Sequence, residues 1–496
     1  MVTIRFLKFF IAAFFAIFII LLLTRDKVPQ LQEFNARNAY QATETASEKD
    51  DTVPVEVTEI KTKPLEDSAN LEEIVTNINS DKEVKEEDQE NDKEEIDDSN
   101  NDVMPAAFLN YRSPTSENKS YCKFSYGLPY SLTYLEEDMA YPPQGGKEST
   151  YRVLYNAIFA YNIENVSSIT YATHLTANYG NFIPELLKRW DGLVTIAAFV
   201  PDVDSFYFLE QINQFCYCEP KMHRVSIHLV TQERLPFSKN DISFGRPDSC
   251  LPKDSSQLVL YKDFDNTVTY PVNVVRNVAR VSALSRYVLL SDIELMPNKG
   301  LAKSFLNFQE NFNKTIEREV FVLPVFEVDE AESVPENKEE LLRLIEDDKA
   351  IYFHGLVCQH CQRFPLFEKW LQSGFSDDIK PFVTVKRHDP YYRWEPIFIG
   401  TNEEPLYNEE LTWEGLQDKM SQSLEMCLLD YHYTVLDNAF LCHWPGMKKK
   451  KPTKEEWRSK FITNNTETYK KIIRNLLERY DNIPECRANF MPQLVP

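Results

Sequence analysis

The sequence predicts an α/β fold with a parallel sheet in one large domain that begins near residue 111, and three observations support this. Buried hydrophobic runs alternate with helical patterns, an order that favours parallel strands. The apolar run at 287–291 leads directly into Asp292 and Glu294, which places two carboxylates after a buried strand. All nine cysteines lie beyond Met104, and aromatic residues and prolines become frequent there, so a packed core becomes possible.

Strand, helix and strand follow one another in the first half of this domain. Residues 193–200 form an apolar run that is typical of a buried strand, and 203–215 form a plausible helix. Residues 224–231 alternate apolar and polar side chains, which predicts a second strand.

A further helix precedes the acid pair. Pro271 suits the first helical position, where a missing N–H does no harm. The apolar side chains that follow it at helical spacing are Val274, Val275, Val278, Val281 and Leu284. Residues 434–441 then predict a last strand of the domain.

The amino terminus contains an uncharged apolar run from Phe9 to Leu23. We expect a transmembrane signal anchor at 9–24 behind a cytosolic tail at 1–8. A cleavable signal peptide is the alternative, although no small-x-small cleavage motif follows the run. Residues 25–110 are acidic and poor in aromatics, so they predict a disordered stem.

The formal net charge of -23 therefore belongs largely to this stem rather than to a binding face. We expect no nucleic-acid partner. Nine cysteines and four Asn-x-Ser/Thr motifs fit an oxidising lumen. An odd number of cysteines leaves at least one outside an intramolecular disulfide. Together these features predict a single-pass type II membrane protein of the Golgi or endoplasmic reticulum with a lumenal domain.

Asp292 and Glu294 are candidate metal ligands. Side chains at i and i+2 of an extended chain point to the same side, and hard oxygen ligands suit Mn²⁺ or Mg²⁺. His443 follows the predicted last strand and is a candidate third ligand, although a purely structural histidine is the alternative.

Cationic side chains are the candidates for binding a diphosphate. Arg276, Asn277 and Arg280 share the polar face of the predicted helix, and Lys448 and Lys449 belong to a run of lysines after a Pro-Gly turn. Ordinary solvated or ion-paired arginines are the alternative. The chain contains no glycine-rich phosphate loop, so a metal ion and cationic side chains would have to bind the phosphate instead.

Cys358 and Cys361, with His354 and His360 nearby, also permit a zinc site. No second ligand pair stands at zinc-finger spacing, and lumenal cysteines more often form disulfides.

Several of these motifs together resemble glycosyltransferase family 49, whose members include β-1,4-glucuronyltransferases. The resemblance covers about 111–451 and rests on the segments at 190–197, 276–280, 287–297 and 438–446, with a His-Gly segment near Cys358. It implies a glycosyltransferase A-type fold, a Rossmann-like mixed sheet, in a lumenal domain. It also implies that Asp292, Glu294 and His443 coordinate Mn²⁺ and that the donor is a UDP-sugar, with Arg276, Asn277 and Arg280 along the nucleotide pocket. The family usually has Asp where this chain has Glu294.

Enzymes of this family invert the anomeric centre, and a carboxylate takes the proton from the acceptor hydroxyl. Glu414 and Asp418 precede the predicted last strand and are the candidates for this base. Acids that begin a helix are the alternative reading for both residues.

The resemblance therefore implies a metal-dependent Golgi transferase that moves a sugar, best assigned as glucuronic acid, to a glycan on secretory glycoproteins. An O-mannosyl glycan of the dystroglycan type is the expected acceptor. A transferase for xylose or N-acetylglucosamine and a non-catalytic glycan-binding relative are the alternatives. A homodimer and a complex with another glycosyltransferase both stay open.

Overall fold

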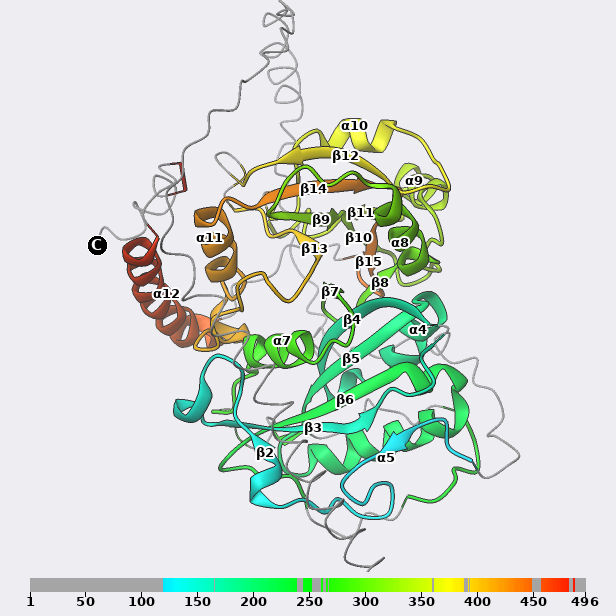
Figure 1. Ribbon diagram of the computed structural model, residues 1–496, viewed down its shortest axis with the longest axis vertical. Coiled ribbons are helices and arrows are strands. Elements are labelled where there is room, and N and C mark those ends of the chain that lie inside the picture. The colour runs from blue at the N-terminus through cyan, green and yellow to red at the C-terminus, as the bar shows by residue number, and fades with distance from the viewer. Residues whose placement is uncertain are drawn as a thin grey trace, which may run out of the picture. The chain divides into compact units, whose positions relative to one another are not determined.

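The computed structural model describes residues within a compact unit that spans Asn101–Pro496 (Figure 1). The described residues are 119–164, 166–238, 244–251, 260–261, 265, 267–358, 361–387, 391, 393–447, 456–480 and 485–486. None of the helices in these ranges is long and apolar enough to cross a membrane. The predicted tail, anchor and stem, residues 1–110, lie outside the described residues.

One large mixed sheet runs through the unit (Figure 1). In spatial order its strands are β1 (Lys123–Phe124), β3 (Tyr151–Phe159), β6 (Val225–Gln232), β5 (Gly192–Phe199), β4 (Ser167–Thr176), β7 (Tyr287–Leu290), β13 (Ile397–Gly400), β9 (Glu319–Leu323), β14 (His432–Asp437) and β12 (Lys380–Val385), and β2 (Met139–Ala140) pairs with β3.

The central strands β6, β5, β4 and β7 are parallel, as the alternation of strands and helices predicted. The direction reverses at β13, which pairs antiparallel with both β7 and β9. The sheet is therefore mixed and Rossmann-like, which is consistent with the expected glycosyltransferase A-type fold. Parallel β4, β5 and β7 end at the same edge, and ligands of open α/β sheets bind at such edges.

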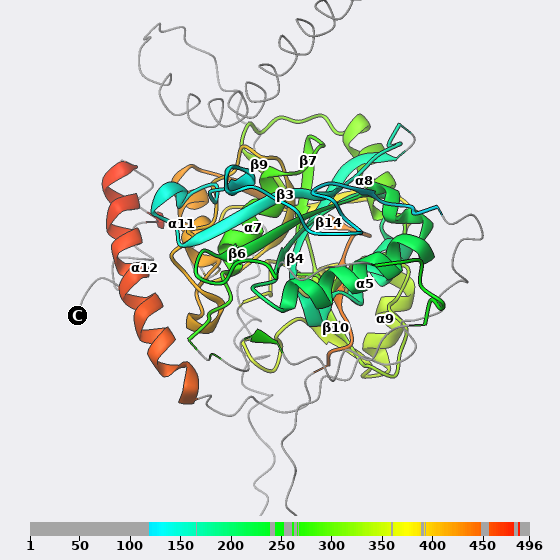
Figure 2. The ribbon, with the colours of Figure 1, turned by 90° about the horizontal axis from the view of Figure 1, so that it is seen from below.

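Eight α-helices are described: α4 (Phe182–Arg189), α5 (Asp204–Cys218), α7 (Val272–Val281), α8 (Leu301–Asn311), α9 (Lys338–Glu346), α10 (Phe367–Gln372), α11 (Met420–Leu428) and α12 (Ser459–Arg479). They cover both faces of the sheet (Figure 2). Ile196 of β5 packs in the core cluster that contains α4 and α5, whereas Ala197 packs in the cluster that contains α7. Successive strand residues point to opposite faces, so both faces of β5 are buried.

Helix α7 is shorter than predicted. It ends at Val281, and the Ser282 hydroxyl donates to the Val278 carbonyl 2.8 Å away. Leu284, expected on the apolar stripe, lies in the turn before β7 and is 64% exposed. Ala283 N–H closes that turn on the Arg280 carbonyl, which brings the chain back to the sheet.

A second, four-stranded sheet lies next to the end of β7. Its order is β11 (Ala350–Tyr352), β10 (Val325–Val328), β15 (Leu441–His443) and β8 (Leu295–Pro297). The strand predicted at 434–441 is therefore wrong in extent: the chain leaves β14 at Asp437, turns at Asn438 with a φ of 61°, and enters β15 of the other sheet. This turn places His443 opposite Leu295, one residue after Glu294.

The cysteines form four disulfides: Cys122–Cys216, Cys218–Cys250, Cys358–Cys361 and Cys427–Cys486. Cys442 is free and buried, in agreement with the odd count. The alternative of a zinc site at Cys358 and Cys361 is not supported, because their sulfurs are bonded to each other.

A buried ion pair connects helices α9 and α10 to strand β14. Lys338 of α9 has a fully buried side chain that donates to Asp437 Oδ1 at 2.6 Å, to the Trp370 carbonyl at 2.7 Å and to Ser373 Oγ at 2.7 Å. The ammonium also lies 4.0 Å from the Trp370 ring centroid. Lys338 thus connects α9, α10 and the end of β14.

We expect Asp437→Ala to lower the free energy of unfolding by about 3–5 kcal/mol, because it leaves the Lys338 charge buried without its counter-ion. Urea unfolding of the domain at 111–496 measures this. The matched control is Glu336→Ala, which removes an exposed pair with Lys299 and should cost less than about 1 kcal/mol. Equal losses in the two variants would contradict the role given to the buried pair.

Candidate functional site

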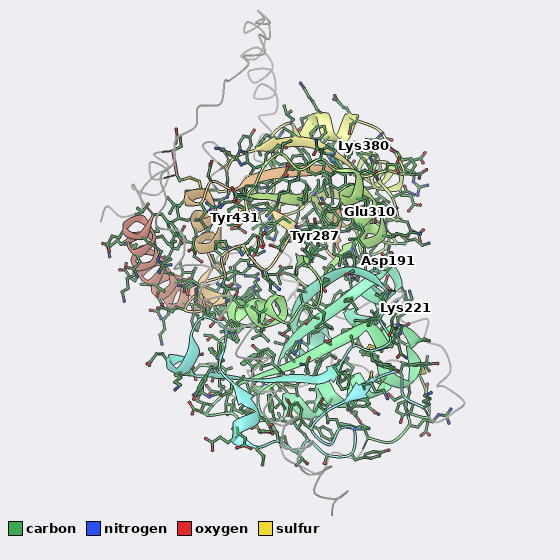
Figure 3. All side chains as sticks on the ribbon, viewed as in Figure 1. Asp191, Lys221, Tyr287, Glu310, Lys380 and Tyr431 are labelled. Carbon is green, nitrogen blue, oxygen red and sulfur yellow. A yellow bond between two sulfur atoms is a disulfide. The ribbon has the colours of Figure 1, made fainter. Side chains whose placement is uncertain are left out.

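The acid pair forms the turn between β7 and β8. Ile293 is buried, with 2% of its surface exposed, whereas Asp292 and Glu294 on either side of it are half-buried. The two carboxylates thus leave the core together, as the i and i+2 spacing predicted. Tyr287, at the start of β7, lies near the centre of the unit in Figure 3.

Three nitrogen-bearing side chains surround the carboxylate of Asp292. Arg276 Nη2 lies 3.2 Å and His174 Nε2 3.1 Å from Oδ1, and Lys419 Nζ lies 3.6 Å from Oδ2. Burial by itself raises the pKa of Asp292, but Lys419, Arg276 and the hydrogen bond from His174 together hold that pKa well below its ordinary value. Asp292 is therefore an ionised carboxylate.

His174 belongs to a hydrogen-bonded chain that orients Asp292. Because an ionised carboxylate only accepts, His174 Nε2 carries the hydrogen. Burial lowers the pKa of His174, and in the neutral ring Nδ1 accepts from the Tyr270 hydroxyl, 2.7 Å away. The Tyr270 N–H donates to Glu414 Oε1 at 2.8 Å. Each member is thus held by the next.

Glu414, a predicted catalytic carboxylate, therefore fixes the backbone of Tyr270. Its side chain is buried, and burial raises its pKa. His174 was missed in the sequence. The available signal was a histidine near the end of a strand run, at the sheet edge where Asp292 also lies.

Asp418, the other predicted catalytic carboxylate, forms an ion pair with Arg276 Nη1. The same guanidinium thus joins Asp418 to Asp292. Leu416 and Gln417 both have a φ of 59°, a costly backbone conformation for residues other than glycine. This strained turn places Asp418 beside Arg276 and Lys419 beside Asp292, so the structure brings Arg276, Asp292 and Asp418 together.

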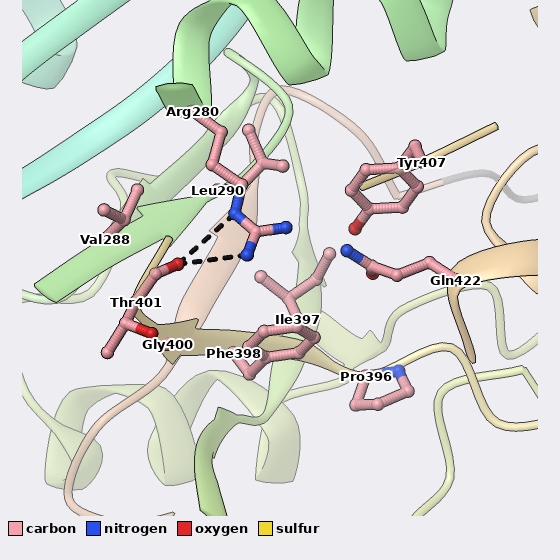
Figure 4. A pocket seen from close by; sticks show the side chains of 10 residues that line it. All are labelled: Arg280, Val288, Leu290, Pro396, Ile397, Phe398, Gly400, Thr401, Tyr407 and Gln422. Atoms are coloured by element: carbon pink, nitrogen blue, oxygen red, sulfur yellow. Dashed lines mark hydrogen bonds between the residues drawn. The ribbon is translucent and has the colours of Figure 1, made fainter. Parts of the chain in front are cut away.

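Asn277 and Arg280 hold a distant segment of the chain. Asn277 Nδ2 donates to the Tyr407 carbonyl at 2.8 Å, and its Oδ1 accepts from the Tyr407 N–H at 3.0 Å. Arg280 donates to the Thr401 carbonyl (Figure 4). It also donates to the carbonyls of Glu404 and Pro405 and pairs with Glu404 Oε2 at 3.0 Å. Both side chains are buried, which excludes the solvated alternative.

The space beside Arg280 is small. The cavity in Figure 4 has a volume of about 10 Å³, which is close to the minimum for one water molecule. The role expected for Asn277 and Arg280 in binding a nucleotide stays a prediction. Their present contacts are those of a structural clamp on the segment 401–407.

His443 is positioned by close packing. Its ring stacks on Phe353 with centroids 5.4 Å apart. A Cβ added to Gly446 would lie 2.0 Å from His443 Nδ1, so only glycine fits over the imidazole in this arrangement. His443 and the acid turn lie on neighbouring strands, β15 and β8.

Two carboxylates and an imidazole are a suitable donor set for Mn²⁺. Within the described ranges, however, no three His, Cys, Asp or Glu side chains converge closely enough to hold a metal ion. The metal role of Asp292, Glu294 and His443 stays a prediction. Lys448 and Lys449 lie outside the described residues.

Lys419 and Glu395 also belong to this site and were not predicted. Burial by itself lowers the pKa of Lys419, but the carboxylates of Asp292, Glu395 and Asp418 raise it by more, so the net shift is upward. Burial raises the pKa of Glu395, and Asp418 adds to that increase. Neither residue lies in a motif that the sequence marks, because their proximity arises only when the segments before β13 and α11 meet.

Comparisons with known proteins point to one family. A family model described as glycosyl-transferase for dystroglycan matches residues 168–481, more than half of the chain. Beta-1,4-glucuronyltransferase 1 of Danio rerio is 29% identical over 285 residues, which cover 55% of this chain and 65% of that protein. The Homo sapiens protein of the same name is 25% identical, over 64% of this chain and 77% of that protein. Xylosyl- and glucuronyltransferase LARGE1 of Homo sapiens is 22% identical, over 62% of this chain and 36% of its own length. The match thus spans slightly less than two thirds of the Danio rerio relative.

We expect Gly446→Ala to destabilise the domain by about 1–3 kcal/mol, because the added methyl group overlaps the His443 ring and forces a shift. Urea unfolding gives the free energy, and the His443 imidazole resonances in an NMR spectrum report the displacement. Gly245→Ala is the control, since no atom lies within 4 Å of a Cβ placed there. Unchanged His443 resonances in Gly446→Ala would contradict the packing argument.

Proposed function

This chain belongs to the glycosyltransferase family described as glycosyl-transferase for dystroglycan, and on that premise we propose that it transfers a sugar from a UDP-sugar to a glycan on secretory glycoproteins. One observation carries the proposal: Asp292, at the carboxyl end of a central parallel strand, lies among Arg276, Lys419 and His174. Open α/β sheets bind ligands at that edge.

Glucuronic acid is the donor sugar we favour. The names of the similar proteins support it, since two of those compared are β-1,4-glucuronyltransferases and LARGE1 is a xylosyl- and glucuronyltransferase. Xylose is the second candidate because LARGE1 carries it in its name, and N-acetylglucosamine is a third. A non-catalytic glycan-binding role is the alternative from another class. For the acceptor we propose an O-mannosyl glycan of the dystroglycan type.

The proposed transfer is metal-dependent and inverting. Asp292, Glu294 and His443 would hold Mn²⁺, or Mg²⁺ in its place, and the metal would stabilise the negative charge of the leaving diphosphate. Arg276 and Lys419 contribute positive charge next to the two carboxylate oxygens of Asp292. His174 and Tyr270 keep the Asp292 carboxylate in one orientation, which favours a site that is ordered before the donor arrives.

We propose a Golgi location, with residues 9–24 as a single type II anchor and the domain in the lumen. Four disulfides in the described residues support an oxidising compartment. A homodimer and a complex with another glycosyltransferase stay open for this chain.

The test is a panel of UDP-sugars offered to the purified lumenal domain with a set of aryl glycoside acceptors, with and without Mn²⁺. We expect transfer from UDP-glucuronic acid in the presence of Mn²⁺ and loss of transfer with a chelator. Glu294→Ala should lower kcat/KM on the order of 100-fold, whereas Glu294→Asp restores the family's usual acid and should retain activity. Neither transfer nor hydrolysis of any UDP-sugar would favour the non-catalytic alternative, and full activity in Glu294→Ala would remove Glu294 from the ligand set.

A further inference from the structure

The two carboxylates that the sequence suggested as bases are already engaged. Asp418 is the counter-ion of Arg276, and Asn273 also donates to its backbone carbonyl at 2.9 Å. Glu414 is buried and accepts the Tyr270 N–H. A base must accept a proton from an incoming hydroxyl, whereas both of these carboxylates already bind groups of the protein.

Glu395 is held at the same site by its backbone. Its N–H donates to the Cys361 carbonyl at 2.7 Å, and its carbonyl accepts from Gln362 Nε2 at 3.0 Å. The preceding Trp394 is 1% exposed and packs against the Tyr433 ring, with centroids 5.8 Å apart. These contacts fix the main chain at Glu395 without using its carboxylate.

The Glu395 side chain itself is left available. In the part of the chain that the structure describes, its carboxylate makes no hydrogen bond or salt bridge, and the residue is half-buried. Lys419 is its main charged neighbour, and Lys419 also faces Asp292. Lys419 is therefore a charged neighbour of both Glu395 and Asp292, the carboxylate that we place at the donor's diphosphate.

The other charged and titratable groups around Glu395 are Asp418, Arg387, Arg276 and Tyr469. Burial is the main cause that raises its pKa, and Lys419 opposes this effect. A carboxylate with a raised pKa is a better proton acceptor near neutral pH than an ordinary glutamate. This property supports an argument that already stands on position and availability.

We propose that Glu395 is the catalytic base that takes the proton from the acceptor hydroxyl. This inference rests on the proposed transferase function. As the O–H bond breaks, the acceptor oxygen forms a bond to the anomeric carbon of the donor sugar. The bond between that carbon and the diphosphate oxygen breaks, and UDP leaves with the electron pair. The proton stays on Glu395 and passes to solvent after the product departs.

The decisive variant is Glu395→Gln, which keeps the shape of the side chain and removes its basicity. We expect kcat to fall by about 100-fold or more, while the affinity for UDP in the presence of Mn²⁺, measured by isothermal titration calorimetry, stays within about twofold of the unmodified protein, since no bond to the nucleotide is lost. Glu368→Gln is the matched control. It makes the same chemical change in an exposed glutamate paired with Arg363 and should leave kcat unchanged.

The pH profile separates a base from a structural residue. The base must be deprotonated, so kcat/KM of the unmodified protein should fall on acidification through a pKa above the ordinary glutamate value of about 4.3. This acid limb should persist in Glu395→Asp, with a lower kcat, and disappear in Glu395→Gln. Thermal unfolding of each variant verifies that the domain is folded.

The outcomes distinguish the two proposals. If the unmodified protein transfers sugar and Glu395→Gln keeps its kcat and its acid limb, Glu395 is not the base and the transferase function stands. If Glu395→Gln loses UDP affinity in parallel with activity, Glu395 acts through the donor site and the assignment is overturned. If the unmodified protein transfers no sugar, both proposals fail together.

Discussion

The site depends on one buried guanidinium. Arg276 of α7 lies between Asp292, in the turn after β7, and Asp418, in the turn before α11. Burial by itself lowers the pKa of Arg276, but the nearby Asp418 and Asp292 raise it by a larger amount. The net shift is upward, so Arg276 stays charged. Two carboxylates brought this close would repel each other in a poorly solvated interior. Arg276 offsets that repulsion and thereby determines where the two segments can meet. A neutral side chain of similar size could not replace Arg276, because Asp418 would lose its ion-pair partner and Asp292 would keep only Lys419 as a counter-ion.

The rest of α7 extends the same organisation. Its apolar side packs on β4 and β5 through Val274, Val275 and Val278. Its polar side, one turn further along, uses Asn277 and Arg280 to bind backbone groups between Thr401 and Tyr407. The helix therefore connects the parallel half of the sheet to a segment that follows the reversed strand β13. A helix that is buried on both sides can carry polar side chains on one side only if each polar group has a hydrogen-bond partner. Here the partners are backbone carbonyls of the segment 401–407, which the helix thereby holds in position.

Sequence reasoning was successful where a local pattern determined the structure. The strands at 192–199 and 225–232, the helix at 272–281 and the acid turn were all visible as periodicity or spacing. Sequence reasoning failed where the structure depends on contacts between residues that are far apart in the chain. The break between β14 and β15 depends on a left-handed turn at Asn438, and no local pattern separates it from a continuing strand. Arg276 and Asp418 are 142 positions apart in the chain, and Glu395 and Lys419 come together only through tertiary packing. The polar face of α7 was predicted correctly, but whether it faced solvent, a nucleotide or the chain itself could be decided only from the folded structure.

The balance of charge at the site supports a divalent cation. Around the acid turn the described cations are Arg276 and Lys419, and the formal carboxylates, apart from Glu395 whose pKa is raised, are Asp292, Glu294 and Asp418. His174 adds no charge because burial keeps its pKa low. Three negative charges against two positive ones leave the cluster negative before any nucleotide binds. A diphosphate would add further negative charge at a partly buried edge, where an uncompensated anion is costly. The chain has no glycine-rich loop to supply backbone N–H donors in place of charge. Diphosphate binding at this edge therefore requires positive charge beyond Arg276 and Lys419. The divalent metal that we propose on Asp292 and Glu294 would supply it while using the carboxylates that would otherwise repel the donor.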